Sequence, residues 1–314
     1  RLPDGELREQ VIERLCSALL DVHGMVRASA ARALDACNWQ PGRDEIAASY
    51  WVTKRLWQMC VAIGPAAARP LALALTEWDW TARRGAAEAL GRIGGSCAVS
   101  ALMGALNDEI PAVAEAAALA LGRLGDPVAA PALLDHLDGL AEFGVRALGQ
   151  IAEKANPATV SVVFLQPLET LLSAEETNPR VNAVNGLAAV GSRRGETSLQ
   201  RQVVQMLSAR IDDPDAQVRR SVLRGIEAIG AHAQEDGLRG EICALQLRAG
   251  NDPDEKVRQA AVNGIGHIGR RIGDLSIRHQ LADEIRATFD APDEQVWAIL
   301  ADLSMPEVVP GLEG

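Results

Sequence analysis

The chain has 314 residues, of which 48% are hydrophobic and 23% are charged, and its formal net charge is −11. This is the composition of a globular protein with ample material for a core. The charge is spread along the chain, with 19 acidic and 15 basic residues in 1–157 and 23 and 16 in 158–314, which disfavours a general nucleic-acid or acidic-membrane binder.

The cysteines argue against a disulfide framework or a zinc site. They are odd in number and scattered, and no C-x-x-C occurs: Cys16, Cys37, Cys60, Cys97 and Cys243. A reducing, cytoplasmic setting fits this usage. No apolar run reaches membrane-spanning length, so we expect no membrane association. No signal peptide is visible. Because the chain starts at Arg1 and not at Met, we expect an excised or processed piece of a longer protein.

Similar phrases recur along the chain at fixed intervals. "ALGRIG" (89–94) and "ALGRLG" (120–125) lie 31 residues apart, and "GLAAVG" (186–191), "GIEAIG" (225–230) and "GIGHIG" (264–269) lie 39 apart. A fixed period of this length is typical of stacked repeats. Each phrase closes a predicted helix, and such helices are expected near 24–37, 80–93, 110–124, 139–152, 178–190, 215–230, 254–269 and 293–303.

Each repeat has the pattern of two amphipathic helices joined by a short loop. Val218, Val222, Ile226 and Ile229 form one apolar stripe, and the preceding segment 200–211 is a second amphipathic helix. Neither helix can bury its stripe alone, so the repeats must stack. One long helix is expected near 44–63 without a partner. The spacing changes near residue 157, so 1–314 is predicted to be one solenoid with short or irregular repeats in 1–157 and regular 39-residue repeats in 158–314.

Two segments carry a family resemblance. "WTARRGAAEALGRIGGSCAVSALMGALND" (80–108) and "DPDEKVRQAAVNGIGHIG" (252–269) closely resemble HEAT repeats, in particular the short bilin-lyase-like class. The resemblance implies an all-α fold, a right-handed α-solenoid of about eight helix pairs plus one irregular helix. It says little about function, since similar arrays serve as scaffolds, transport receptors, a DNA glycosylase, bilin lyases and sensor arms.

A second recurring phrase begins the later repeats. "DPDAQVRRSV" (213–222) returns as "DPDEKVRQAA" (252–261), with an arginine in the first turn of each second helix. By resemblance to HEAT proteins these arginines form a ladder between repeats, fixed by bidentate contacts to loop acids. A ligand-binding role for the same column stays open, and Ala114 and Trp297 interrupt it. The predicted ladder comprises Arg27, Arg180, Arg219 and Arg258 with Asp21, Asp213 and Asp252.

No pattern for catalysis or for a cofactor is found. The five histidines are not at metal-binding spacings, no glycine-rich phosphate loop occurs, and no G-x-S-x-G is present. We therefore expect no enzyme activity, no cofactor and no metal.

The second helices offer a predicted binding face. In HEAT arrays they line the concave side, so residues off the apolar stripe should face the groove. These positions vary in kind between repeats, as a specific surface or a merely solvated one would. Their mixed charge and amides suit a protein segment better than a phosphate backbone. The predicted groove residues are Lys54, Gln58, Arg84, Asn185, Arg220, Arg224 and Asn263.

Tryptophan is concentrated in one region. Five of the six lie between Trp39 and Trp80. Trp57 falls on an apolar stripe, whereas Trp78 and Trp80 flank a loop aspartate. They are either an irregular packing patch or anchors for a partner, because tryptophan is enriched at interface hot spots.

These observations predict a non-catalytic protein-interaction scaffold or recognition arm of a larger cytosolic assembly. Its partner would be another protein or another domain of the same chain. Two alternatives remain: a nucleic-acid-binding subunit that uses its arginines, and a bilin-lyase-like chromophore-handling subunit.

Overall fold

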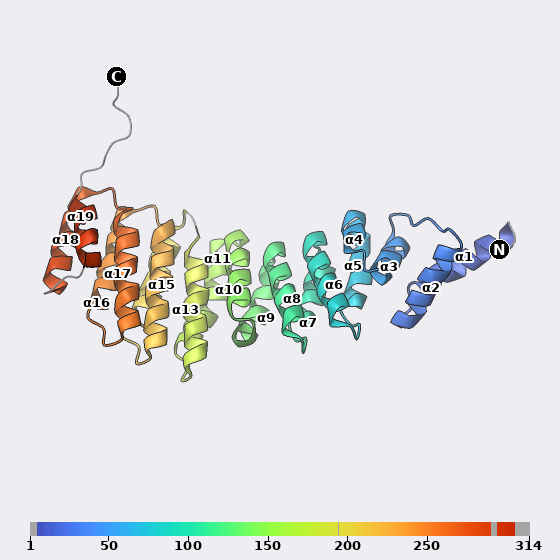
Figure 1. Cartoon of the computed structure of the whole chain (residues 1–314), viewed down its shortest axis with the longest axis horizontal. Coiled ribbons are helices and arrows are strands. Elements are labelled where there is room, and N and C mark those ends of the chain that lie inside the picture. Colours follow the sequence, from blue (N-terminus) through green and yellow to red (C-terminus); the bar gives the residue numbers. More distant parts are fainter. Residues whose placement is uncertain (1–4, 194, 290–293, 305–314) are drawn as a thin grey trace, which may run out of the picture. The chain divides into compact units, whose positions relative to one another are not determined.

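The computed structural model describes residues 5–193, 195–289 and 294–304, which are helical with connecting loops and contain no strand. The chain divides into two compact units, residues 1–154 and 155–314. Within each unit successive helices stand side by side (Figure 1). The all-helical solenoid predicted from the repeats is confirmed.

The first unit is built from five helix pairs. Short 3-10 turns at Pro65–Ala67 and Pro127–Ala129 precede two of the helices. The elements are α1 (Glu6–Ala18), α2 (Gly24–Ala36), α3 (Glu45–Thr53), α4 (Trp57–Ile63), α5 (Ala68–Ala74), α6 (Trp80–Ile93), α7 (Ser96–Ala105), α8 (Pro111–Leu124), α9 (Ala130–Asp135) and α10 (Leu137–Lys154).

The second unit has longer first helices. The run 157–172 is one helical stretch interrupted by a π-turn at Ser161–Leu165. The elements are α11 (Pro157–Val160), α12 (Gln166–Leu172), α13 (Thr177–Gly191), α14 (Thr197–Ser208), α15 (Ala216–His232), α16 (Asp236–Arg248), α17 (Glu255–Gly269), α18 (Leu275–Thr288) and α19 (Glu294–Ser304).

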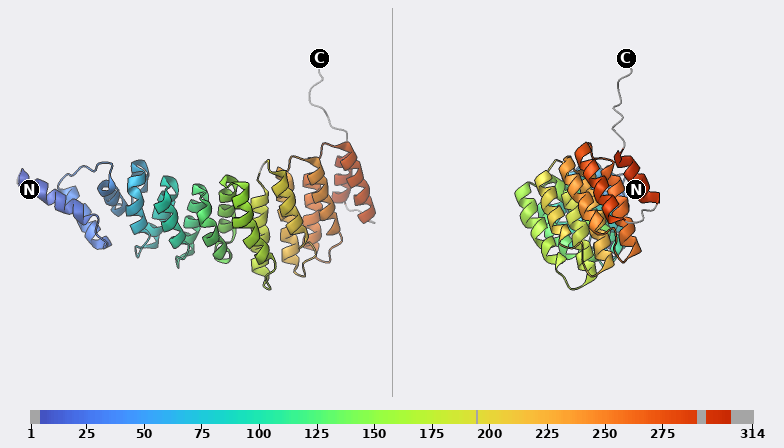
Figure 2. Two further views of the ribbon diagram at one scale, coloured as in Figure 1. Left: turned by 180° about the vertical axis from the view of Figure 1, so that it is seen from behind. Right: turned by 90° about the vertical axis from the view of Figure 1, so that its left-hand side faces the viewer.

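Each unit forms two layers. In the first unit α3, α5 and α7 pack in one layer, and α4, α6, α8 and α10 pack in the other. In the second unit α14, α16 and α18 form the first-helix layer and α13, α15, α17 and α19 the second-helix layer. The yellow-to-orange second helices stand side by side in the view from behind as well (Figure 2). The core lies between the layers, where the predicted stripe residues Val218, Val222, Ile226 and Ile229 are fully buried.

Aspartates and glycines set the ends of many helices. The carboxylates of Asp79, Asp215 and Asp254 each accept a backbone N–H from the first turn of the following helix, as N-caps do. Gly94 and Gly125 end α6 and α8 with φ of 79° and 73°, a conformation that favours glycine. The helix bounds also show that the predicted positions of the second helices agree with the structure to within a few residues.

The prediction of one long unpaired helix near 44–63 is wrong. The chain breaks after α3, where Arg55 takes φ 58° and Leu56 N donates to Trp51 O at 3.0 Å. This left-handed stop turns the chain, so that α3 packs against α5 and α4 against α6. The segment is a short helix pair, and the described residues contain nine pairs in place of eight plus a single helix.

Candidate protein-interaction surfaces

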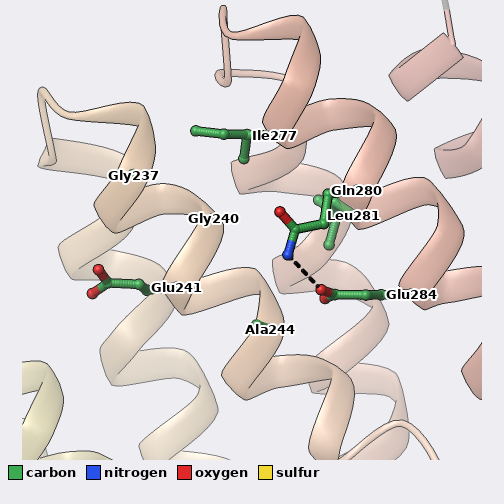
Figure 3. A pocket seen from close by; sticks show the side chains of 8 residues that line it. All are labelled: Gly237, Gly240, Glu241, Ala244, Ile277, Gln280, Leu281 and Glu284. Carbon is green, nitrogen blue, oxygen red and sulfur yellow. Dashed lines mark hydrogen bonds between the residues drawn. The ribbon is translucent and has the colours of Figure 1, made fainter.

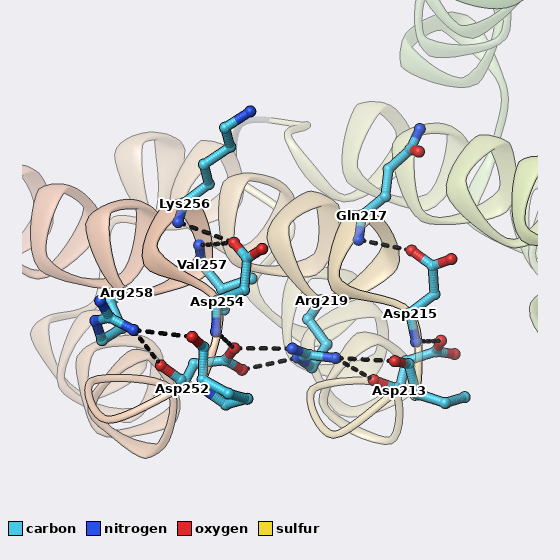
Figure 4. Close-up of polar contacts among 11 residues, drawn as sticks. Asp213, Asp215, Gln217, Arg219, Asp252, Asp254, Lys256, Val257 and Arg258 are labelled. Atoms are coloured by element: carbon cyan, nitrogen blue, oxygen red, sulfur yellow. Dashed lines mark hydrogen bonds and ion pairs between the residues drawn. The ribbon is translucent and has the colours of Figure 1, made fainter.

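The recurring Asp-Pro-Asp phrase builds a ladder of ion pairs in the second unit (Figure 4). Arg219 donates to both carboxylate oxygens of Asp252, from Nε at 2.7 Å and from Nη2 at 2.8 Å. Its Nη1 donates to Asp213 O of its own loop at 2.8 Å. Arg180 reaches Asp213 of the next repeat at 3.1 Å. Each arginine thus closes its own loop and binds the next one.

Arg258 and Arg27 complete the predicted set. Arg258 donates to the carbonyl oxygen of Asp252 at 2.7 Å, and the acidic loop that would follow lies outside the described residues. Arg27 donates to the carbonyl oxygen of Asp21 at 2.8 Å and to Glu77 Oε1 at 2.6 Å. The carboxylate of Asp21 accepts instead from His23. The structure therefore brings together every predicted ladder residue except the Asp21 carboxylate.

The sequence reasoning missed one rung, Arg83. It donates to Asp108 from Nε at 2.6 Å and from Nη2 at 2.8 Å, and to its own loop at Glu77 O. The spacing of its sequence could have revealed it, because the N-cap Asp79 lies four residues before Arg83, as Asp215 does before Arg219. The similarity to the Val-Arg phrase was obscured because alanine stands at position 82, where the later repeat has Val218.

Most of these ladder arginines have little surface left for a ligand. Arg27, Arg83 and Arg180 are buried, and their donors are turned to carboxylates and loop carbonyls. The hydrogen bonds from Arg83 hold the pKa of Asp108 below its usual value, and those from Arg219 do the same for the pKa of Asp252. The geometry is that of a structural clamp.

The ladder contact between arginine and aspartate is missing where Ala114 takes the place of the arginine. There His136 links two successive loops, with Nε2 2.9 Å from Asn107 Oδ1 and Nδ1 2.8 Å from Ala132 O. Hydrogen bonds of a histidine therefore stand where the first unit lacks one Arg–Asp rung.

The tryptophans separate into two groups. Trp39 meets Tyr50 edge-on with ring centroids 5.4 Å apart, and Tyr50 meets Trp51 at 4.8 Å. These rings pack on the core of α1 to α3. Trp57 lies against α6, where its ring occupies the space that a side chain on Gly85 would need. The packing interpretation holds for this group.

Trp78 and Trp80 belong to the second group. Trp78 is 93% exposed and Trp80 is 41% exposed. Trp78 borders a pocket of about 410 Å³ between the loop before α2, the end of α3 and the loop before α6. Met25 and Val22, which also line it, are 78% and 74% exposed. The pocket is therefore rimmed by large apolar side chains that nothing in the described residues covers.

The predicted groove residues of the first unit are engaged with neighbours. Lys54 pairs with Asp35 and lies over the Tyr50 ring. Gln58 accepts from Arg92 at 3.2 Å, and Arg84 pairs with Glu88 at 3.1 Å on the same helix. These contacts are exposed, where an ion pair contributes about 0.2–1 kcal/mol, so they compete only weakly with a partner.

The predicted groove residues of the second unit lie on stacked helices. Asn185 is on α13, Arg220 and Arg224 are on α15, and Asn263 is on α17. Asn263 Oδ1 accepts from the amides of Gln259 and Gln295 at 3.0 and 2.6 Å. Within the described residues, Arg220 and Arg224 make no hydrogen bond or ion pair. The structure brings this subset together on one layer.

The first-helix layer of the second unit carries hollows that the sequence did not predict. One of about 280 Å³ lies between α16 and α18, lined by Gly237, Gly240 and Ile277 with Glu241 and Glu284 at its edges (Figure 3). Others lie between α14 and α16 and between α12 and α14. Small residues, Gly237, Gly240 and Ala244, form part of the lining of the hollow between α16 and α18.

Two of the cysteines, Cys60 and Cys243, are buried thiols. Burial raises the pKa of Cys60 to about 11 and of Cys243 to about 12, so both are held as thiols and are poor nucleophiles. The described part of the chain contains no group of three or more His, Cys, Asp or Glu placed to hold a metal ion. It also contains no helix long and apolar enough to cross a membrane.

Comparisons with known proteins point to the same fold. Residues 68–152 match the family model of HEAT repeats. Two crystal structures of Kap121p mutants align with TM-scores of 0.64 and 0.65. Each is 11% identical, and they cover 96% and 95% of this chain but only 38% and 37% of theirs. An engineered protein aligns at 18% identity over 93% of this chain and 87% of its own, with a TM-score of 0.41. A search of curated proteins finds no match.

Proposed function

We propose that the chain is a non-catalytic protein-interaction scaffold, and that one contact with its partner is the pocket beside Trp78. The observation that supports this proposal most directly is the near-complete exposure of Trp78 at the rim of that pocket. Isolated exposed apolar residues are common on protein surfaces, but a contiguous patch around a concavity marks an interaction site.

The pocket has the composition of an interface centre. Trp78, Met25 and Val22 supply its apolar rim, and the ion pair of buried Arg27 with half-buried Glu77 forms part of its wall. Ladder contacts fix the wall on both sides, so little ordering is needed when a partner binds. A pre-formed surface of this kind lowers the entropic cost of association.

The partner we propose is another protein or another domain of the same chain. An apolar side chain of that partner would enter the pocket and cover Trp78. Trp80 and the groove residues Lys54, Gln58 and Arg84 would lie toward the polar margin, where contacts add specificity more than affinity. A stacked array also offers many positions for such contacts, one per repeat.

The test uses the full chain with a photo-crosslinking amino acid at position 78, and in parallel at position 297. Trp297 is another exposed tryptophan, 58% exposed, and it does not line the pocket. In native extract, position 78 should yield a specific protein crosslink that position 297 does not. Affinity of the captured partner for Trp78→Ala should fall by about 30-fold, the effect of an interface hot spot, and Trp297→Ala should bind as the unchanged chain does.

Equal affinity of the Trp78→Ala and Trp297→Ala variants would sink the pocket as the contact. Capture that disappears on nuclease treatment would instead favour the nucleic-acid-binding alternative. Circular dichroism of both variants checks that the array is intact.

A further inference from the structure

Two arginines on α15 have side chains that make no hydrogen bond or ion pair with any described residue. Arg220 and Arg224 lie four residues apart and therefore on one face of the helix. Arg224 is exposed and Arg220 is half-buried. The preceding residue, Arg219, is fully engaged by Asp213 and Asp252. Of the three arginines in "VRRSVLR" (218–224), Arg219 thus belongs to the ladder, and Arg220 and Arg224 remain available to a ligand.

Amide side chains flank these arginines on the neighbouring helices. α13 and α17 both pack against α15, and Asn185 and Asn263 lie one 39-residue repeat before and after Arg224. The three side chains therefore form a row across the second-helix layer. The amide nitrogen of Asn263 stays available, because its Oδ1 is the atom that takes both glutamine donors.

The side chains left unpaired on this face are basic, although the chain is acidic. The helices α13, α15 and α17 carry six arginines and lysines and two glutamates. Three of the six, Arg180, Arg219 and Arg258, belong to the ladder. Glu227 is taken by His267 at 2.8 Å, and Glu255 is the first residue of α17. Lys256 projects to the side away from the ladder (Figure 4). Arg220, Arg224 and Lys256 are the unpaired cations of this face among the described residues.

We infer that this face of the second unit binds an extended, acidic polypeptide segment. The inference rests on the proposed scaffold function and names the chemistry of a ligand for a second surface. Packed helices lie about 8–10 Å apart, and an extended chain advances about 3.3 Å per residue, so one helix spans about three residues of ligand. Asparagine amides can donate to and accept from its main chain, while the guanidinium groups take its carboxylates.

The small number of unpaired cations in this row, and the amides between them, favour a peptide over a nucleic acid. A phosphate backbone would call for a longer series of unpaired cations, whereas this row alternates amide and arginine. The opposite charges would also steer an acidic segment to this face of an otherwise acidic protein.

The experiment is a fluorescence-anisotropy titration of the full chain with labelled peptides of about 12 residues. One probe has glutamate at every third position, separated by glycine and serine. The matched probe has glutamine at those positions, and a labelled single-stranded oligonucleotide is the third. We expect the glutamate probe to bind at least about tenfold more tightly than the glutamine probe, with affinity that falls as salt increases.

The variants decide the location. Arg220→Glu combined with Arg224→Glu should weaken the glutamate probe by about tenfold or more. Arg286→Glu, an exposed charge change on the first-helix layer of the same unit, should leave it unchanged. Asn185→Ala should weaken both peptide probes, since main-chain contacts do not depend on their charge.

Three outcomes would overturn the inference. They are equal binding of the two peptides, an unchanged affinity of the Arg220/Arg224 double variant, and an oligonucleotide that binds more tightly than the glutamate probe. None of them bears on the crosslink at position 78, so the scaffold proposal can survive the failure of this one.

Discussion

The two units solve the same stacking problem with different chemistry. In the first unit glycines bring second-helix backbones together: a Cβ built on Gly91 would lie 2.8 Å from Ala120 Cα, and one on Gly122 would lie 2.9 Å from Ala147 Cα. In the second unit two glycines at the ends of second helices leave room for branched side chains: a Cβ on Gly191 would meet Ile229 Cδ1 at 2.9 Å, and one on Gly230 would meet Ile268 Cδ1 at 2.8 Å.

The comparison extends to the surfaces. The first unit interrupts its ladder at Ala114 and exposes Trp78 beside a pocket. The second unit repeats the Arg–Asp contact in successive loops and exposes arginine and asparagine. The candidate surface of the first unit is thus apolar, whereas that of the second unit is a periodic polar row. We take this as the reason for proposing different ligand chemistry on the two units.

The largest expected effect comes from breaking a rung in either unit. Arg83→Ala leaves the carboxylate of Asp108 buried without its partner, and Arg219→Ala does so for Asp252. We expect a loss of about 3 kcal/mol in the free energy of unfolding for each, measured by urea denaturation. Arg84→Ala is the control, since Arg84 is exposed and pairs only within its own helix. A loss no greater for Arg83→Ala than for Arg84→Ala would show that the ladder adds nothing to stability.

A smaller effect should separate the glycines of the two units. Gly91→Ala forces two helix backbones apart and should cost about 2 kcal/mol. Gly230→Ala meets side-chain atoms alone, Ile268 Cδ1 at 2.8 Å and Ile242 Cδ1 at 3.1 Å. These chain ends can shift, and the helix gains about 1 kcal/mol of propensity, so the net change should be near zero. Urea denaturation of both variants tests this. Equal losses would mean that the glycines act alike and that the distinction between backbone and side-chain contact carries no energetic weight.

The smallest effect concerns pH. The pKa values of Asp108 and Asp252 are lowered in the folded state by Arg83 and Arg219, whereas in the unfolded chain an aspartate titrates near its usual value of about 3.9. Their contribution is therefore fully present above that value and is lost as the pH falls through the lower folded-state pKa. Thermal denaturation at a series of pH values from neutral to acid should show this loss as a fall in Tm. Asp252→Asn should reduce the slope of Tm against pH. An unchanged slope in Asp252→Asn would assign the acid sensitivity to other carboxylates.

The sequence by itself determined the architecture and most helix ends. The apolar stripe of Val218, Val222, Ile226 and Ile229 needs only the helical period, and a cap such as Asp215 needs only its own first turn. The 39-residue interval made the Arg219 rung readable as well, because the same local phrase occurs in each repeat. These signals depend on residues close together in the chain, so they can be read without the fold.

Only the tertiary structure decided which residues meet across repeats and which stay exposed. It broke the segment 44–63 at Arg55, because each half packs on a different neighbouring helix. It paired Arg83 with Asp108 over 25 residues, and it partly buried Trp39 and Trp57 while leaving Trp78 in solvent. It also placed hollows on the first-helix layer. Such outcomes depend on the stacking of helices from separate repeats, and the composition of one repeat does not specify the surface that its neighbours cover.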